Sequence, residues 1–310
     1  MIKEIGSANK EEWLKLRKGY IGGSDAAAVI GLNPYKSAFT LWAEKTGRIP
    51  EFEGNITTQV GAYLEDLVAQ IFMSEAGKAV RRKNKMLVNE DYPWACADVD
   101  RMVVGEKAFL EIKTTNSPLA LKKFKNGEYP EAWYCQMVHY LAVTGLEKAY
   151  LAVLIECRDF KIFELERDEE EIETLMKEEA AFWNLVQSDI PPVADGLKST
   201  ADTLTEIYPQ SNGESVDLCN YVNELKRYMV LSAEIKVLEA QKDEVANKVK
   251  AFLGEAGKGE NEHFKVSWTS SERKTLDSKR LAQEHPEIDL NGYYKVSTTR
   301  TFRVTEKGDK

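Results

Sequence analysis

Two charged residues interrupt the otherwise apolar segment AFLEIKTT, residues 108–115. Side chains alternate between the two faces of a β-strand, so Glu111 and Lys113 would share one face. The simplest interpretation is a half-exposed strand whose charges lie in water. The alternative is a catalytic site in which Glu111 binds a metal ion and Lys113 orients or deprotonates a water molecule that attacks a phosphate.

A second acidic residue lies close enough in the sequence to join such a site. Asp100 precedes Glu111 by one short hairpin with its turn at 105–106, which would bring the two carboxylates together. Adjacent carboxylates repel each other, and a divalent cation between them removes the repulsion. Metal-assisted phosphodiester hydrolysis needs acidic ligands, a carbonyl ligand and a cation near the nucleophile. Asp98 competes with Asp100 for the ligand role, and the pattern favours Asp100.

The composition limits both the metal and the compartment. The 310 residues include only three dispersed histidines and four cysteines without a C-x-x-C pair, so a metal would be a hard ion such as Mg²⁺ or Mn²⁺ held by oxygen. With no signal peptide and no apolar run of about 18 residues, we expect a cytoplasmic protein with reduced thiols and no membrane contact. The net charge of -9 argues against nonspecific coating of nucleic acid, but it is compatible with an enzyme that has a basic channel.

The elements that must position these residues can be read from periodicity and capping signals. Helices are predicted at 10–17, 24–31, 37–47, 57–77, 131–145 and 168–187, and strands at 79–89, 94–105, 107–115, 148–156 and 159–166. The apolar stripe of the 57–77 helix consists of Val60, Leu64, Leu67, Val68, Ile71 and Phe72, with Glu65 at its edge. The order of elements predicts an α/β domain over residues 1–195 with a mixed central sheet flanked by helices.

A second unit is expected over residues 200–310. Apolar residues alternate three and four apart from Leu231 to Phe252, with Lys242 in one slot, which predicts a long helical hairpin or a coiled coil. The segments 263–276 and 292–304 alternate as two amphipathic strands around a small helix at 277–285. The predicted accessory unit is therefore helical with a small β part.

Several motifs in order resemble the YqaJ-type viral recombinases, relatives of the phage lambda exonuclease. The segment LRKGYIGGSDAAAVIGLNPYKSAFTLWAEKTG resembles the opening of that family, and GAYLEDLV, the D-R…L-E-I-K-T pattern and Q-x-x-x-Y in YCQMVHYLAVTG follow in the family's order. The resemblance spans residues 10–190. It implies the PD-(D/E)XK nuclease fold of the restriction-endonuclease-like superfamily.

The resemblance also implies roles for the acidic residues and the lysine. Asp100 and Glu111 match the metal ligands, and the Ile112 carbonyl matches a further ligand. Glu65 matches a helix glutamate that binds the second metal directly or through water, and Lys113 matches the catalytic lysine.

Other matched residues surround this centre. Gln136 matches a glutamine that lies over the site, and Tyr140 completes its motif in a packing or chemical role. Arg17 and Ser24 match residues that hold a 5′-terminal phosphate, and an arginine fork beside a hydroxyl at a helix N-terminus would suit an anion. Asp25 is expected to cap that helix or to hold Arg17.

The resemblance implies a Mg²⁺-dependent 5′-to-3′ exonuclease, with Mn²⁺ as a substitute, acting on the ends of linear double-stranded DNA. Such an enzyme would leave 3′ single-stranded overhangs for recombination by a phage single-strand annealing protein, its expected partner. A homo-oligomer, with a trimeric ring favoured, and a phage or prophage origin in a bacterial host cell are also implied. The alternatives are a DNA endonuclease of the same fold and a non-catalytic DNA-binding or assembly protein.

Overall fold

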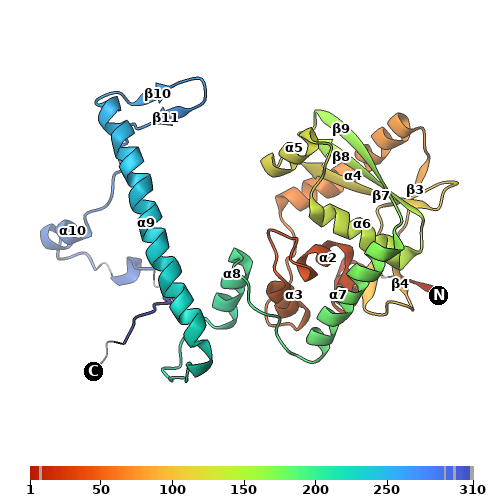
Figure 1. Cartoon of the computed structure of the whole chain (residues 1–310), viewed down its shortest axis with the longest axis horizontal. Helices are drawn as coiled ribbons and strands as arrows, with labels where there is room; N and C mark the ends of the chain where they lie inside the picture. The colour runs from red at the N-terminus through yellow and green to blue at the C-terminus, as the bar shows by residue number, and fades with distance from the viewer. Residues whose placement is uncertain (7–8, 290, 296–297, 308–310) are drawn as a thin grey trace. The chain divides into compact units, whose positions relative to one another are not determined.

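The computed structural model describes residues 1–6, 9–289, 291–295 and 298–307 in two compact units (Figure 1). The units are Met1–Tyr208 and Pro209–Lys310. Helix α8, Lys198–Ile207, packs on α3, Ala38–Lys45, where the Thr40 and Thr203 hydroxyls are hydrogen-bonded at 2.9 Å. The boundary between the two units therefore lies after the end of α8. The sequence predicts this boundary between residues 195 and 200.

The centre of the first unit is a five-stranded mixed sheet. Its order is β3-β6-β7-β8-β9, comprising Val80–Arg82, Arg101–Val103, Ala108–Thr115, Lys148–Ile155 and Asp159–Glu166. Strands β7 and β8 are parallel, and the other neighbours are antiparallel. The predicted mixed α/β architecture is confirmed.

A second sheet divides two of the predicted strands. Its order is β1-β4-β5-β2, comprising Ile2–Ile5, Met86–Asn89, Ala95–Ala97 and Ile21–Gly22. The segments 79–89 and 94–105, predicted as single strands, each cross from one sheet to the other. The crossing at 98–100 buries Val99 in the core and leaves Asp98 and Asp100 on either side of it outside both strands.

Helices cover both faces of the five-stranded sheet (Figure 1). Phe109 packs in the core that includes α6, Glu131–Thr144, whereas Leu110 packs with the buried residues of α4, Ile56–Ala76. Residues 108–112 of β7 are all buried. The strand is therefore not half-exposed at Glu111, which is buried, whereas Lys113 is partly exposed.

The apolar stripe predicted for α4 is wrong at two of its six positions. Val68 and Phe72 are fully buried, but Val60 and Leu67 are 48 % and 47 % exposed. Only the C-terminal half of the helix has a buried face against the sheet, so the remaining apolar residues stay on the surface.

The described residues of the first unit contain four further helices. They are α1, Lys10–Lys18; α2, Gly23–Val29; α5, Pro118–Lys125; and α7, Glu169–Gln187. The N-cap of α2 is Gly22, and the Asp25 carboxylate accepts a hydrogen bond from the Gly22 amide at 3.2 Å. Asp25, the third residue of the helix, thus caps the helix with its side chain.

The second unit is built on one long helix, α9, Val222–Leu253, not on a helical hairpin (Figure 1). It also contains a hairpin of β10, Lys258–Glu260, with β11, Lys265–Ser267, the helix α10, Ser278–Glu284, and 3-10 turns at Cys219–Tyr221 and Asn291–Tyr293. The strand predicted at 263–276 is reduced to β11. The strand predicted at 292–304 is absent from its described residues, and 296–297 lie outside them. Over the described chain, no helix is long and apolar enough to cross a membrane.

Candidate active site

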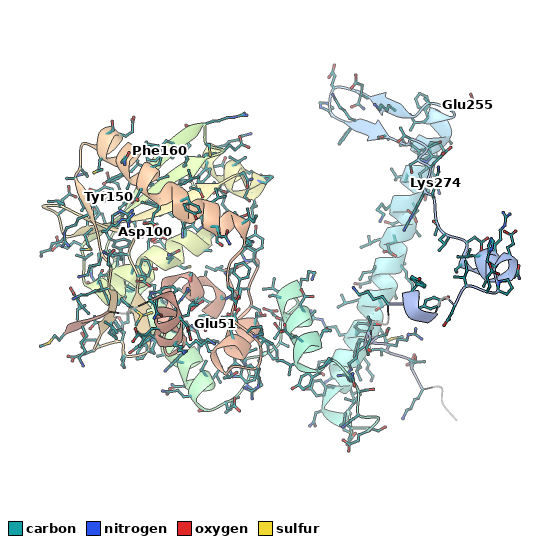
Figure 2. All side chains as sticks on the ribbon, turned by 180° about the vertical axis from the view of Figure 1, so that it is seen from behind. Glu51, Asp100, Tyr150, Phe160, Glu255 and Lys274 are labelled. Carbon is teal, nitrogen blue, oxygen red and sulfur yellow. The ribbon has the colours of Figure 1, made fainter. Side chains whose placement is uncertain are left out.

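Asp100 and Glu111 form the acidic centre of the first unit. Figure 2 labels Asp100 within this unit. The Asp100 Oδ2 atom accepts a hydrogen bond of 2.7 Å from the Ile112 amide, which holds the carboxylate against β7. Glu111 is 2 % exposed, and its Oε2 atom is buried without a hydrogen-bond partner among the described residues.

Lys113 and Gln136 complete a network around Glu111. The Glu111 Oε1 atom lies 2.8 Å from the Lys113 ammonium and accepts a 2.7 Å hydrogen bond from the Gln136 amide nitrogen. The Gln136 oxygen in turn accepts from Lys113 at 2.8 Å. Gln136 therefore orients both charged groups, and its nitrogen also lies 3.3 Å from the Tyr140 hydroxyl.

The charges of this network are strongly coupled. Burial, followed by the charge of Glu111, raises the pKa of Asp100 well above its usual value. Burial also raises the pKa of Glu111, although Lys113 opposes that shift. Burial alone would lower the pKa of Lys113, but Glu111 outweighs it and raises that pKa. Lys113 is therefore a cation in this arrangement, and its 24 % exposed side chain remains accessible from the site.

Glu65 lies near this pair but has its own partner. Its carboxylate forms an ion pair with Arg101, whose Nη2 atom donates to Asp66 at 2.7 Å. The other guanidinium nitrogen donates to the Asp100 carbonyl at 2.6 Å. Arg101 thus ties the α4 carboxylates to the segment that carries Asp100.

The donor set fits a hard divalent cation. The half-buried Asp100 carboxylate and the buried Glu111 carboxylate, whose Oε2 atom has no hydrogen-bond donor in the described part of the chain, provide negative charge, and Mg²⁺ commonly uses one or two carboxylates while keeping several waters. Across the described residues, no three His, Cys, Asp or Glu side chains gather closely enough to hold a metal by themselves. A cation here would therefore be held by Asp100 and Glu111, with the Ile112 carbonyl and water as the remaining oxygen ligands.

Asp98 has a different environment from Asp100. Its Oδ2 atom accepts a 2.6 Å hydrogen bond from the Trp13 indole, and burial raises its pKa. It lines a small cavity with Arg17 and Ser24. Asp100 thus lies beside Glu111, whereas Asp98 lines the neighbouring cavity.

Arg17 and Ser24 meet in this cavity, as the anion-site prediction requires. The Arg17 Nη2 atom donates to the Ser24 hydroxyl at 2.6 Å. Burial would lower the pKa of Arg17, but Asp25 together with other nearby acidic groups raises it, so the guanidinium stays charged. Ser24 and Gln136 line both this cavity and the adjacent hollow that contains Lys113. Gln136 therefore lies between the Arg17–Ser24 cavity and the hollow that contains Lys113.

Gly23 allows a close approach between α2 and α6. A Cβ atom at this position would lie 2.5 Å from the Tyr140 ring, closer than non-bonded carbons can pack. The ring is 5 % exposed and packs edge-on against Phe109 at 5.8 Å between centroids. Tyr140 thus has a clear packing role, and its hydroxyl also contacts Gln136.

A buried ion pair lies next to Arg17 and next to Ser24 of α2. Lys45 and Asp25 are 3.1 Å apart, with side chains only 2 % and 4 % exposed. Burial would raise the pKa of Asp25, but Lys45 and Arg17 together lower it to about 2. Asp25 therefore remains ionised and holds α2, which carries Ser24, against α3.

Sequence reasoning assigned no role to three of these residues: Trp13, Lys45 and Arg101. Each is a partner of a carboxylate that the sequence had singled out. Arg101 directly follows Asp100 and offered a local signal. Trp13 is 85 residues from Asp98, so only the folded chain shows their contact.

The amino-acid sequence matches known families over most of its length. A family model described as the YqaJ-like viral recombinase domain matches residues 12–147. The chain is 38% identical over 309 residues to the uncharacterized protein YqaJ of Bacillus subtilis (strain 168), covering 98% of this chain and 95% of that protein. Protein D345L of African swine fever virus (strain Badajoz 1971 Vero-adapted) is 42% identical over 45 residues, 14% of this chain and 13% of that protein.

The fold also matches solved structures. The alkaline exonuclease LHK-Exo from Laribacter hongkongensis superposes with a TM-score of 0.51 at 23% identity, covering 63% of this chain and all of that one. Its complex with dAMP gives the same TM-score at 22% identity over the same shares of both chains. These likenesses show that the chain shares the fold of this alkaline exonuclease over 63% of its length.

Proposed function

We propose, on the premise that this chain belongs to the YqaJ-like viral recombinase family, that it is a Mg²⁺-dependent exonuclease acting on double-stranded DNA. The observation that carries the proposal is the half-buried Asp100 beside the buried Glu111, one oxygen of which has no hydrogen-bond partner within the described ranges, next to the protonated Lys113. The structural relative LHK-Exo is named an alkaline exonuclease and was solved with dAMP, in accord with this proposal.

The residues of the site fit hydrolysis of a phosphodiester. A divalent cation bound at Asp100 and Glu111, with Mn²⁺ as a substitute for Mg²⁺, would activate water and offset negative charge on the phosphate. Lys113 remains charged and would stabilise the charge that develops as the water oxygen bonds to phosphorus and the 3′ oxygen departs. Gln136 holds Lys113 in place through its 2.8 Å hydrogen bond.

The adjacent cavity would determine from which end the enzyme degrades a DNA strand. A 5′-terminal phosphate bound by Arg17 and Ser24 would place the next phosphodiester towards Lys113, on the other side of Gln136. Cleavage there releases one nucleotide and leaves a new 5′-phosphate on the shortened strand. The enzyme would therefore degrade the 5′ strand and leave a 3′ overhang.

Such an overhang is the substrate of strand annealing. A phage single-strand annealing protein is the partner that the proposed product calls for, and a ring of three subunits around DNA is the assembly we propose for the nuclease unit. Glu65 would bind a second cation only after leaving Arg101, so we propose that DNA binding or metal binding reorganises this ion pair.

Replacement of Arg17 by Gln tests whether the protein recognises the 5′-terminal phosphate of the DNA. We expect the wild-type protein with Mg²⁺ to digest 5′-phosphorylated linear duplex on the order of tenfold to a hundredfold faster than 5′-hydroxyl duplex, because charged hydrogen bonds to phosphate contribute about 1.5–3 kcal/mol. Arg17→Gln removes the guanidinium and should abolish this preference. Initial rates of nucleotide release on the two substrates provide the measurement.

A surface arginine provides the matched control. Arg48 forms an ion pair with Asp189 and packs over Trp42, and it does not line the Arg17 cavity. Arg48→Gln should keep the preference for 5′-phosphate. An Arg17→Gln protein with the wild-type preference would refute the assignment of the cavity.

A further inference from the structure

The long helix α9 presents an apolar seam that its own unit does not cover. The helix has 32 residues, which corresponds to about 48 Å, and none of them is buried. The seam comprises Leu231, Ile235, Leu238, Val245, Val249 and Phe252, whose exposed fractions run from 38 % at Val249 to 92 % at Phe252. Long helices derive most of their stability from packing of such a face, so this seam points to a partner.

The seam has the spacing of a coiled coil. Tyr228, Ile235, Lys242 and Val249 occupy successive a positions of a heptad, and Leu231, Leu238, Val245 and Phe252 occupy the d positions. Among the described residues of the unit, Phe302 contacts the seam at one end through the Tyr228 ring, with centroids 5.6 Å apart. The rest of the seam is free for another helix.

We propose that α9 pairs with α9 of a second copy of this chain as a two-stranded antiparallel coiled coil. In the register with full overlap of the seams, Leu231 faces Val249 of the second copy, and Ile235 faces its Val245. This proposal concerns the second unit alone and does not depend on the nuclease reaction.

Charge complementarity selects the antiparallel direction. The flanking g positions in the centre of the helix are Glu234, Gln241 and Lys248. In the antiparallel register, Glu234 faces Lys248 of the second copy, and symmetry produces this pair twice. Lys248 now pairs with Glu244 on its own helix at high exposure, so it can exchange partners at little cost. In a parallel pair, Glu234 would face Glu239 of the other helix, and symmetry would produce this repulsion twice, whereas the antiparallel register brings only Glu239 and Glu239 of the second copy together as like charges.

Lys242 also favours the antiparallel direction of the helix pair. In a parallel pair it would face Lys242 of the second copy across the core. In the antiparallel pair it faces Leu238, whose neighbour Glu239 can neutralise its charge. A single polar residue at an a position is a common device for fixing register and direction.

The mass of the full-length protein tests the pairing. We expect the wild-type chain in analytical ultracentrifugation at tens of micromolar to form a heavier species than the Leu238→Glu chain, because neither a monomer nor the proposed ring of three can pair all of its α9 helices within itself. Val237→Glu is the matched control, because Val237 is the next residue but lies off the seam with 57 % exposure. It should keep the wild-type mass. Equal masses for wild type and Leu238→Glu would overturn the proposal, including the case in which a different protein covers the seam.

A charge exchange tests the direction. Glu234→Lys or Lys248→Glu alone should weaken the pair on the order of tenfold in its dissociation constant, because two attractive pairs become repulsive. The double variant should recover the wild-type association. If Glu234→Lys alone strengthens association, the helices are parallel and the proposed direction is wrong.

Discussion

The Lys113→Ala protein should lose about 10²–10³-fold in the rate of nucleotide release from linear duplex DNA with Mg²⁺. The ammonium is the cation that lies 2.8 Å from both Glu111 and Gln136, and its raised pKa keeps it charged at the reaction centre. Alanine removes the charge that would stabilise the developing transition state. Single-turnover digestion of an end-labelled duplex measures the loss.

Lys107→Ala is the matched control, because it removes a lysine next to β7, the strand that carries Lys113. Lys107 immediately precedes β7 and forms an exposed ion pair with Glu147, far from the hydrogen-bond network of the site. Its replacement should leave the rate within twofold of the wild type, since exposed pairs contribute little. Circular dichroism should show both variants folded, because Glu111 can take up a proton when its cation is removed. Full activity in a folded Lys113→Ala protein would exclude the proposed role.

Replacement of Lys45 by Met should destabilise the first unit by about 3–5 kcal/mol. The change leaves Asp25 buried without the ammonium that lies 3.1 Å from it. For a unit of this size such a loss corresponds to a fall of about 6–20 °C in the unfolding temperature. Calorimetry or thermal circular dichroism provides the measurement.

Two variants make this stability test specific. Lys15→Met removes an exposed partner of Glu11 and should change stability by less than about 0.5 kcal/mol. The double variant Lys45→Met/Asp25→Asn removes both buried charges and should recover part of the loss. If Lys45→Met melts like the wild type, the pair does not hold α2 against α3 as described.

Much of the fold could be predicted because its signals are local. The alternation of Phe109, Leu110 and Ile112 predicts β7, and the following helix and two strands have equally clear periods. The division of 79–89 and 94–105 between two sheets could not be predicted, because nothing in their alternation marks where the pairing partner changes. The exposure of Val60 and Leu67 could also not be predicted from the sequence, because an apolar stripe does not show how far the sheet that packs against it extends.

The candidate site shows the same division between local and distant signals. Asp100, Glu111 and Lys113 follow from short spacing in one segment, and the structure brings them together. The Glu65–Arg101 and Trp13–Asp98 contacts join segments 36 and 85 residues apart, and their geometry depends on the packing of whole helices. The partners of charged residues were therefore the part that sequence alone could not provide.

The most direct test of the account is digestion of two DNA substrates, a 5′-end-labelled linear duplex and a covalently closed circle of the same sequence, each with Mg²⁺ and with EDTA. The account predicts rapid release of labelled mononucleotide from the linear duplex with Mg²⁺, no release with EDTA, and an intact circle in both conditions. Equal digestion of the circle would contradict the exonuclease assignment, and undiminished release in EDTA would contradict the metal centre at Asp100 and Glu111.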